Sequence, residues 1–181
     1  IAGYSRPPRR SAGRVPEWMD PDSQPAQRPI VAIMLDTDDG GASWRAQSAS
    51  VFGQLSRVVS TPKIGLSLIE FGEGFPWPSE VLKVYWNGLG NKRVYREKDR
   101  AVRDVALDSI GRGYLVAVER SGSISALPIP GKLHVLESLD LEKWAEAEVD
   151  YKAVANHAFL AIASDDSRFI ATDTGMILKY E

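Results

Sequence analysis

The chain has 181 residues, of which 44% are hydrophobic and 25% are charged, values typical of a globular domain with a substantial core. A formal net charge of −2 provides no general attraction for nucleic acid or anionic membrane, and no apolar run approaches the roughly 18 residues of a membrane-spanning helix. The absence of cysteine excludes disulfides and thiolate chemistry, and two histidines argue against a multi-histidine metal site, so we expect neither a metal nor a cofactor.

Residues 1–29 are rich in proline and arginine. They hold six of the eleven prolines, together with Arg6, Arg9, Arg10, Arg14 and Arg28. Proline has no N–H donor for a strand ladder, so we predict a linker or a long loop insertion here. A basic, extended recognition segment is the alternative.

A dense polar turn follows at residues 37–44, which we call the first turn motif. The apolar run 29–35 ends there and an apolar stretch restarts at Trp44, which predicts two strands joined by a short turn. The residue types follow the order Ser/Thr-x-Asp-x-Gly-x-Ser/Thr-Trp at Thr37, Asp39, Gly41, Ser43 and Trp44. The carboxylate and the hydroxyls can bind turn backbone, and the indole can anchor the turn on an apolar face. If Trp44 is buried, its replacement by alanine should cost about 3–5 kcal/mol.

Further strands are predicted from apolar or alternating runs bounded by turn residues. In the first half they fall at 55–59, 64–71 and 81–86, followed by a turn at 87–91. Residues 92–104 are the most charged stretch, where a solvated strand and loop are expected, with at most one short helix.

The last third has the clearest strand rhythm. Strands are predicted at 102–107, 113–118, 123–127 and 132–137, which would form one four-stranded sheet, and then at 157–163, 168–172 and 176–180. Residues 137–144, the second turn motif, repeat the first in degenerate form. Ser138, Asp140 and Trp144 fit, whereas Glu142 and Lys143 stand where glycine and a hydroxyl are expected. Residues 144–154 favour a helix on propensity alone, but we expect a strand leaving the motif.

The two turn motifs resemble the Asp-box, or bacterial neuraminidase repeat, of β-propellers, and their tryptophans lie 100 positions apart. The resemblance implies an all-β fold of four-stranded blades over residues 30–181. About three to four blades would fit, near or below the closure range of about four to eight, so a fragment or an open arc is expected.

The stretch Asp39-Gly40-Gly41-Ala42-Ser43-Trp44 is also similar to the box of the photosystem II stability/assembly factor family. That resemblance implies a non-enzymatic propeller with a protein partner, structural turn motifs, no catalytic residue, and docking through Arg93, Arg96, Arg100 and Arg103. Charge reversal at Arg96 and Arg100 would then weaken a complex and leave the melting temperature nearly unchanged.

Three alternatives stay open at this point. A glycoside hydrolase of the sialidase or xyloglucanase type would bind carbohydrate, although no acid–nucleophile pair of carboxylates stands out. A sortilin-type peptide-binding propeller is the second alternative. The third is another all-β domain in which the motif is coincidental. The sequence leaves the cellular compartment open.

Overall fold

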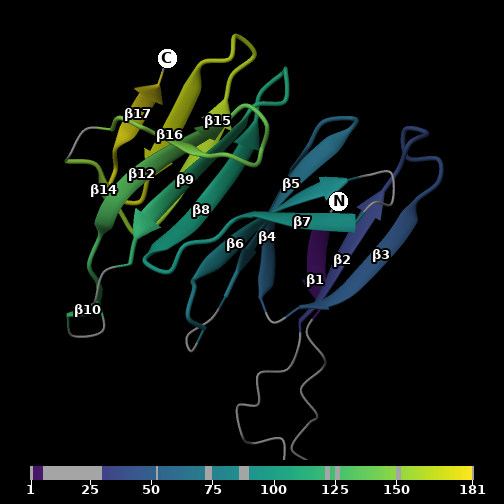
Figure 1. Ribbon diagram of the computed structural model, residues 1–181, viewed down its shortest axis with the longest axis horizontal. Coiled ribbons are helices and arrows are strands. Elements are labelled where there is room, and N and C mark those ends of the chain that lie inside the picture. Colours follow the sequence, from purple (N-terminus) through teal and green to yellow (C-terminus); the bar gives the residue numbers. More distant parts are fainter. Residues whose placement is uncertain are drawn as a thin grey trace, which may run out of the picture. The chain divides into compact units, whose positions relative to one another are not determined.

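The computed structural model describes residues 2–5, 30–51, 53–71, 75–85, 90–120, 123–124, 127–149 and 152–180. Every regular element in these ranges is a β-strand and none is a helix, which confirms the all-β class (Figure 1). The chain divides into two compact units, Ile1–Leu55 and Ser56–Glu181, which we take one at a time.

The first unit is a three-stranded antiparallel sheet. It contains β1 (Ala2–Ser5), β2 (Ile30–Asp36) and β3 (Arg45–Val51), in the order β1-β2-β3. The β2–β3 hairpin closes with Asp36 opposite Arg45, directly before and after the first turn motif, as predicted. Strand β1 lies within the stretch predicted as a linker. It precedes the first proline, so its backbone can pair with β2, while residues 6–29 lie outside the described ranges.

A four-stranded antiparallel sheet, the β4–β7 sheet, comes next and belongs to the second unit from Ser56 onward. Its strands are β4 (Gln54–Ser60), β5 (Ile64–Glu70), β6 (Ser79–Tyr85) and β7 (Gly90–Tyr95), adjacent in chain order. The three predicted strands are confirmed. The charged stretch 92–104 forms the end of β7 and the start of the next strand, not a helix. Residues 92 and 93 of this stretch are exposed, as expected for a solvated strand.

The next sheet, which we call the β8–β13 sheet, has the strand order β13-β12-β9-β8. Its members are β8 (Arg100–Leu107), β9 (Gly113–Glu119), β12 (Gly131–Ser138) and β13 (Ala145–Ala147), and β14 (Val154–Ala155) pairs with the start of β12. Strand β13 confirms that a strand leaves the second turn motif.

The prediction that residues 123–127 form a strand of this sheet is wrong. A small separate hairpin of β10 (Ser123–Ile124) and β11 (Leu127–Pro128) occupies that place. Pro128 and Pro130 cannot donate to a central ladder, so pairing with β9 resumes only at β12. Gly131 permits the close approach there, because a Cβ at this position would fall on the carbonyl oxygen of Glu119.

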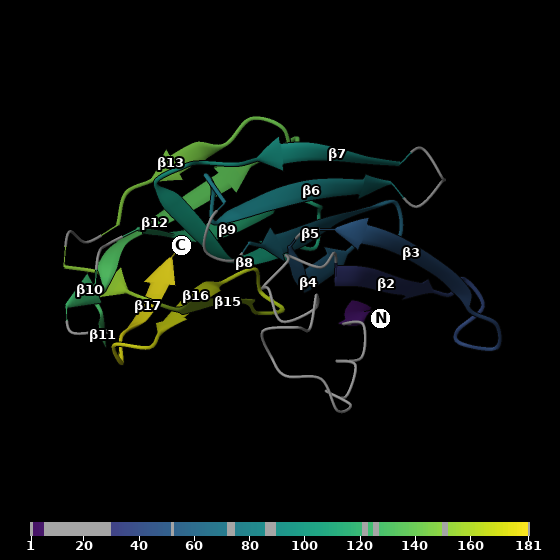
Figure 2. The ribbon, with the colours of Figure 1, turned by 90° about the horizontal axis from the view of Figure 1, so that it is seen from below.

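The β15–β17 sheet completes the described chain with β15 (Ala158–Ile162), β16 (Arg168–Thr172) and β17 (Ile177–Tyr180), as predicted. Both views show its strands beside β8 and β9 (Figures 1 and 2), and β15 contacts both of these strands.

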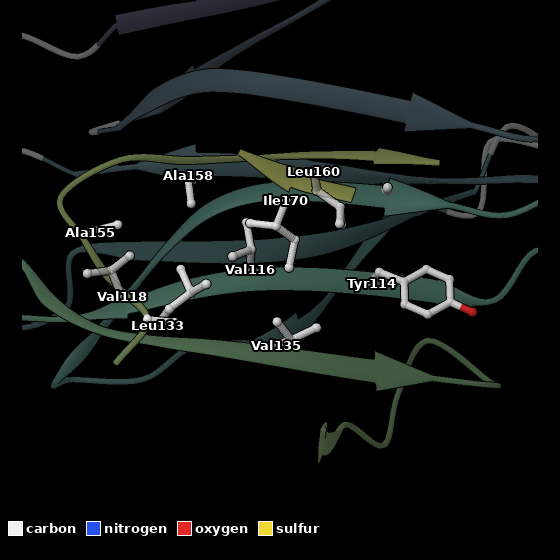
Figure 3. Packing of buried hydrophobic residues seen from close by; sticks show 11 residues of the cluster. Tyr114, Val116, Val118, Leu133, Val135, Ala155, Ala158, Leu160 and Ile170 are labelled. Atoms are coloured by element: carbon white, nitrogen blue, oxygen red, sulfur yellow. The ribbon is translucent and has the colours of Figure 1, made fainter. Parts of the chain in front are cut away.

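The core of the second unit lies on both faces of the β8–β13 sheet. Along β9, Leu115 and Ala117 pack in a cluster with Leu66 and other residues of the β4–β7 sheet. The alternate residues of β9 pack in a second cluster with the β15–β17 sheet, where Figure 3 shows Val116 beside Ile170. Strand β9 is therefore buried on both sides, which accounts for its nearly continuous apolar sequence.

Candidate functional site

The first turn motif is held together by the carboxylate of Asp39. The hydroxyl of Thr37 donates to Asp39 Oδ1 at 2.7 Å and accepts from the Gly41 N–H at 2.9 Å. Ser43 donates to the same carboxylate through its N–H at 2.9 Å and through its hydroxyl at 2.6 Å. These hydrogen bonds, led by that from the Ser43 hydroxyl, hold the pKa of Asp39 far below its usual range. Both oxygens of this carboxylate accept hydrogen bonds from the turn.

The second turn motif repeats this arrangement with different side chains. The Ser138 hydroxyl donates to Asp140 Oδ1 at 3.1 Å, and the N–H groups of Glu142 and Lys143 donate to the same oxygen at 2.8 Å each. The hydrogen bond from the Lys143 N–H is the main cause that lowers the pKa of Asp140 to about 2. Since these two donors are backbone groups, the missing glycine and hydroxyl do not destroy the motif.

The second motif is also one residue shorter between its aspartate and its tryptophan. In the first motif Gly40 and Gly41 both have positive φ, at 72° and 98°. In the second, Leu141 alone crosses into this region, with φ of 60°. In both motifs the aspartate binds the N–H of the residue directly before the tryptophan.

The two motif tryptophans behave differently. The Trp44 indole folds back on its own turn, donates to the Gly41 carbonyl at 3.1 Å and remains 47% exposed, so the expected burial is not found. The Trp144 ring is partly buried and packs against the cluster around Leu115, edge-on to Tyr95 with ring centroids 6.4 Å apart. Trp144 is therefore the ring that joins its turn motif to a core.

The four predicted docking arginines do not form one open patch. Arg93 is exposed on β7. The others have intramolecular partners: Arg96 lies 3.8 Å over the Trp77 ring, Arg100 pairs with Glu146 at 2.9 Å and Arg103 pairs with Glu70 at 3.3 Å. Charge reversal at Arg100 would place two carboxylates side by side, so we now expect it to lower the melting temperature as well.

Three sheets of the second unit meet at a polar hollow of about 230 Å³, which we call the arginine hollow. Its lining residues are Ser56, Arg57, Glu70, Arg103, Asp104, His157, Ala158 and Phe159. They come from β4, β5, β8 and the start of β15. The prediction from sequence included only Arg103 of this set.

Asp104 is the residue of the arginine hollow whose side chain is held in place by backbone hydrogen bonds. Its side chain is 7% exposed, and it accepts from the N–H of Leu160 at 2.8 Å and of Val105 at 2.9 Å. The Nε of Arg57 lies 3.2 Å from Asp104 Oδ1. One carboxylate thus links β8 to β15 and orients a guanidinium from β4.

A second polar cluster surrounds the buried His134 of β12. Its side chain is 2% exposed, and its ring nitrogens lie 2.5 Å from a Glu146 oxygen and 3.0 Å from a Glu119 oxygen. Arg100 also donates to Glu146. The hydrogen bonds from His134 and then from Arg100 lower the pKa of Glu146 below its ordinary value.

This cluster predicts a loss of stability in acid. A carboxyl whose pKa is lowered by folding stabilises the folded state above its unfolded pKa, near 4.5, and loses that contribution as the pH falls through the folded pKa. The free energy of unfolding measured in urea should therefore fall below about pH 4.5, and it should fall more steeply for the wild type than for Glu146→Gln, which cannot titrate at this position. Parallel pH profiles for the two proteins would contradict this assignment.

The described residues include no group of three or more histidine or acidic side chains that could hold a metal ion. Within the same ranges, no helix is long and apolar enough to cross a membrane.

No protein-family model matches the sequence, and a search among curated proteins finds no similar chain.

Proposed function

We propose that this chain is a segment of an Asp-box β-propeller that binds a partner protein and does not catalyse a reaction. The observation that carries the proposal is the repeated turn motif with its aspartate-centred hydrogen bonds. In each case the motif links two neighbouring antiparallel strands, β2 to β3 and β12 to β13. A similar aspartate-centred turn recurs about 100 residues later, although its side chains differ and it is one residue shorter, which supports a repeat architecture.

The strand pairing of the second unit supports the same proposal. In the β8–β13 sheet Val118 of β9 pairs with Leu133 of β12. In the β15–β17 sheet Ala171 of β16 pairs with Ile177 of β17, and we compare these two pairs. The first pair lies in the core cluster, whereas Ile177 is exposed. The last sheet therefore leaves exposed the kind of face that the sheet before it buries, which is the face that a further repeat would cover in a stacked array.

The state of the carboxylates favours binding over catalysis. A glycosidase needs one carboxyl group as acid and a second as base or nucleophile. Asp39 and Asp140 are bound to their own turns. In the arginine hollow, Asp104 already has three donors, and Glu70 is paired with Arg103.

Two measurements test this proposal. The purified chain should release no product from a fluorogenic sialoside or from xyloglucan oligosaccharides. In the source organism, a photo-crosslinking residue at position 93, on the exposed part of β7, should capture a protein that also binds the chain when both are pure. If the chain hydrolyses either substrate and Glu70→Gln abolishes this activity, the chain is a hydrolase and the proposal is wrong. Failure of the captured protein to bind in pure form would also overturn it.

A further inference from the structure

We infer that the arginine hollow binds a carboxylate group presented by a peptide. This inference rests on the proposed function in one respect, because it names the chemical group of the partner that the chain recognises. The features that support it all belong to the second unit: two guanidinium groups, the carboxylate that fixes one of them, and the backbone irregularity that brings them together.

A β-bulge aims two consecutive side chains into the hollow. Val102 pairs with Ala117 and Asp104 with Val116, so Arg103 is an extra residue on β8. Successive side chains of a regular strand point to opposite faces, yet Arg103 and Asp104 both line this hollow. Bulges often re-aim side chains next to binding sites, which is the arrangement seen here.

Arg57 offers an open donor edge at the mouth of the hollow. Its Nε is occupied by Asp104, and its side chain is 49% exposed. Among the residues that the structure describes, its terminal nitrogens have no hydrogen-bond partner. Because the Asp104 contact is fixed by two backbone N–H groups, the guanidinium is held in place before any ligand arrives. Such a fork matches the two oxygens of a carboxylate.

Arg103 is only partly satisfied. It makes a single contact of 3.3 Å with Glu70 through Nη1. Its Nε is buried and has no acceptor in the described part of the chain. A buried donor without an acceptor is unfavourable, so a small rearrangement that brings a ligand oxygen to this guanidinium would be stabilising.

The size and rim of the hollow select the ligand. A volume of about 230 Å³ accommodates a carboxylate with a short apolar group. Phe159 is 65% exposed and His157 is also exposed, so the rim offers an aromatic surface beside the charged groups. Either an acidic side chain or a chain-terminal carboxylate of a peptide would fit this combination.

The test uses two small acids as probes on the full chain. N-acetylphenylalanine represents a chain terminus, and N-acetylglutamic acid α-amide represents an acidic side chain. N-acetylphenylalaninamide, which lacks the carboxylate, is the control ligand. We expect at least one acid to shift the backbone amide NMR signals of residues 56–57, 103–104 and 157–159 at millimolar concentration, and the amide to leave them unchanged. Whichever acid binds more tightly identifies the source of the carboxylate.

Matched arginine variants complete the test. Arg57→Gln should weaken the binding of that acid about tenfold or more, because the open fork is lost. Arg120→Gln removes an equally charged, exposed side chain outside the hollow and should leave binding unchanged. A preserved melting temperature in Arg57→Gln shows that the loss is not unfolding.

The inference is overturned if neither acid shifts these signals up to about 10 mM, a concentration that detects even very weak affinity. Equal shifts from the amide control, or unchanged binding by Arg57→Gln, would also overturn it. These outcomes are independent of the hydrolysis and crosslinking measurements, so failure of the hollow is distinguishable from failure of the proposed function.

Discussion

Replacement of Trp144 by alanine is expected to lower the free energy of unfolding of the second unit by about 3 kcal/mol or more. The Trp144 ring packs against the cluster that contains Leu115 and Leu136, and edge-on against Tyr95. It also borders Gly113, where a Cβ would lie only 2.9 Å from the ring. Alanine would leave a cavity among these groups, and the short turn at Asp140 would lose its attachment to the sheet.

Trp44→Ala is the matched comparison, because Trp44 occupies the same place in the first turn motif. Its ring is 47% exposed and contacts mainly its own turn, so the expected loss for the first unit is below about 1 kcal/mol. Amide hydrogen exchange separates the two units, with Leu66 and Leu115 as reporters of the second. This account is contradicted if Trp144→Ala leaves amide exchange in the second unit unchanged. It is also contradicted if Trp44→Ala reduces protection in the first unit as much as Trp144→Ala reduces it in the second.

The difference between the two tryptophans shows what a motif can predict. Residue types and spacing correctly located both hairpins, because hydrogen bonding by aspartate and hydroxyl side chains to nearby backbone is a local property. The burial of the indole is not local, since it depends on which strands lie beside the turn. Both motifs end in an aspartate-bound turn followed by a tryptophan, but the strands beside Trp44 and Trp144 differ.

The strands were predictable for a similar reason. Apolar runs such as 113–118 and 168–172 indicate strands on their own. Residues 123–124 and 127–128 instead pair with each other in a separate hairpin. The prolines at 128 and 130 were the available signal that the ladder is interrupted there.

The arginine hollow was not predictable from the sequence. Its residues come from four strands, and the bulge at Arg103 has no distinct sequence signature. Arg93, Arg96, Arg100 and Arg103 attract attention as a cluster of charge, yet the fold gives three of them different partners. Arg57, which the structure places at the mouth of the hollow, stands in the sequence as a single basic residue in an otherwise ordinary strand.

Asp104 provides the second large expected effect. Asp104→Ala should lower the free energy of unfolding by about 3 kcal/mol, because it removes an acceptor of the buried Leu160 N–H and the partner of the Arg57 guanidinium. Asp104→Asn keeps an oxygen that can accept from Leu160 and should lose less than half as much. Arg57→Gln should cost under about 1 kcal/mol, since that guanidinium is half exposed and can be hydrated.

Urea unfolding of the three variants, with amide exchange at Leu160, measures this order. The largest increase in exchange should occur at Leu160 in Asp104→Ala, where β15 loses its hydrogen bond to β8. If Asp104→Asn is as destabilising as Asp104→Ala, the negative charge and not the acceptor holds the sheets together. If Arg57→Gln matches both, the ion pair is the main contribution, and the arginine hollow would then be a structural joint. A small cost for Arg57→Gln instead means that this arginine is dispensable for folding, which leaves its open edge available to a ligand.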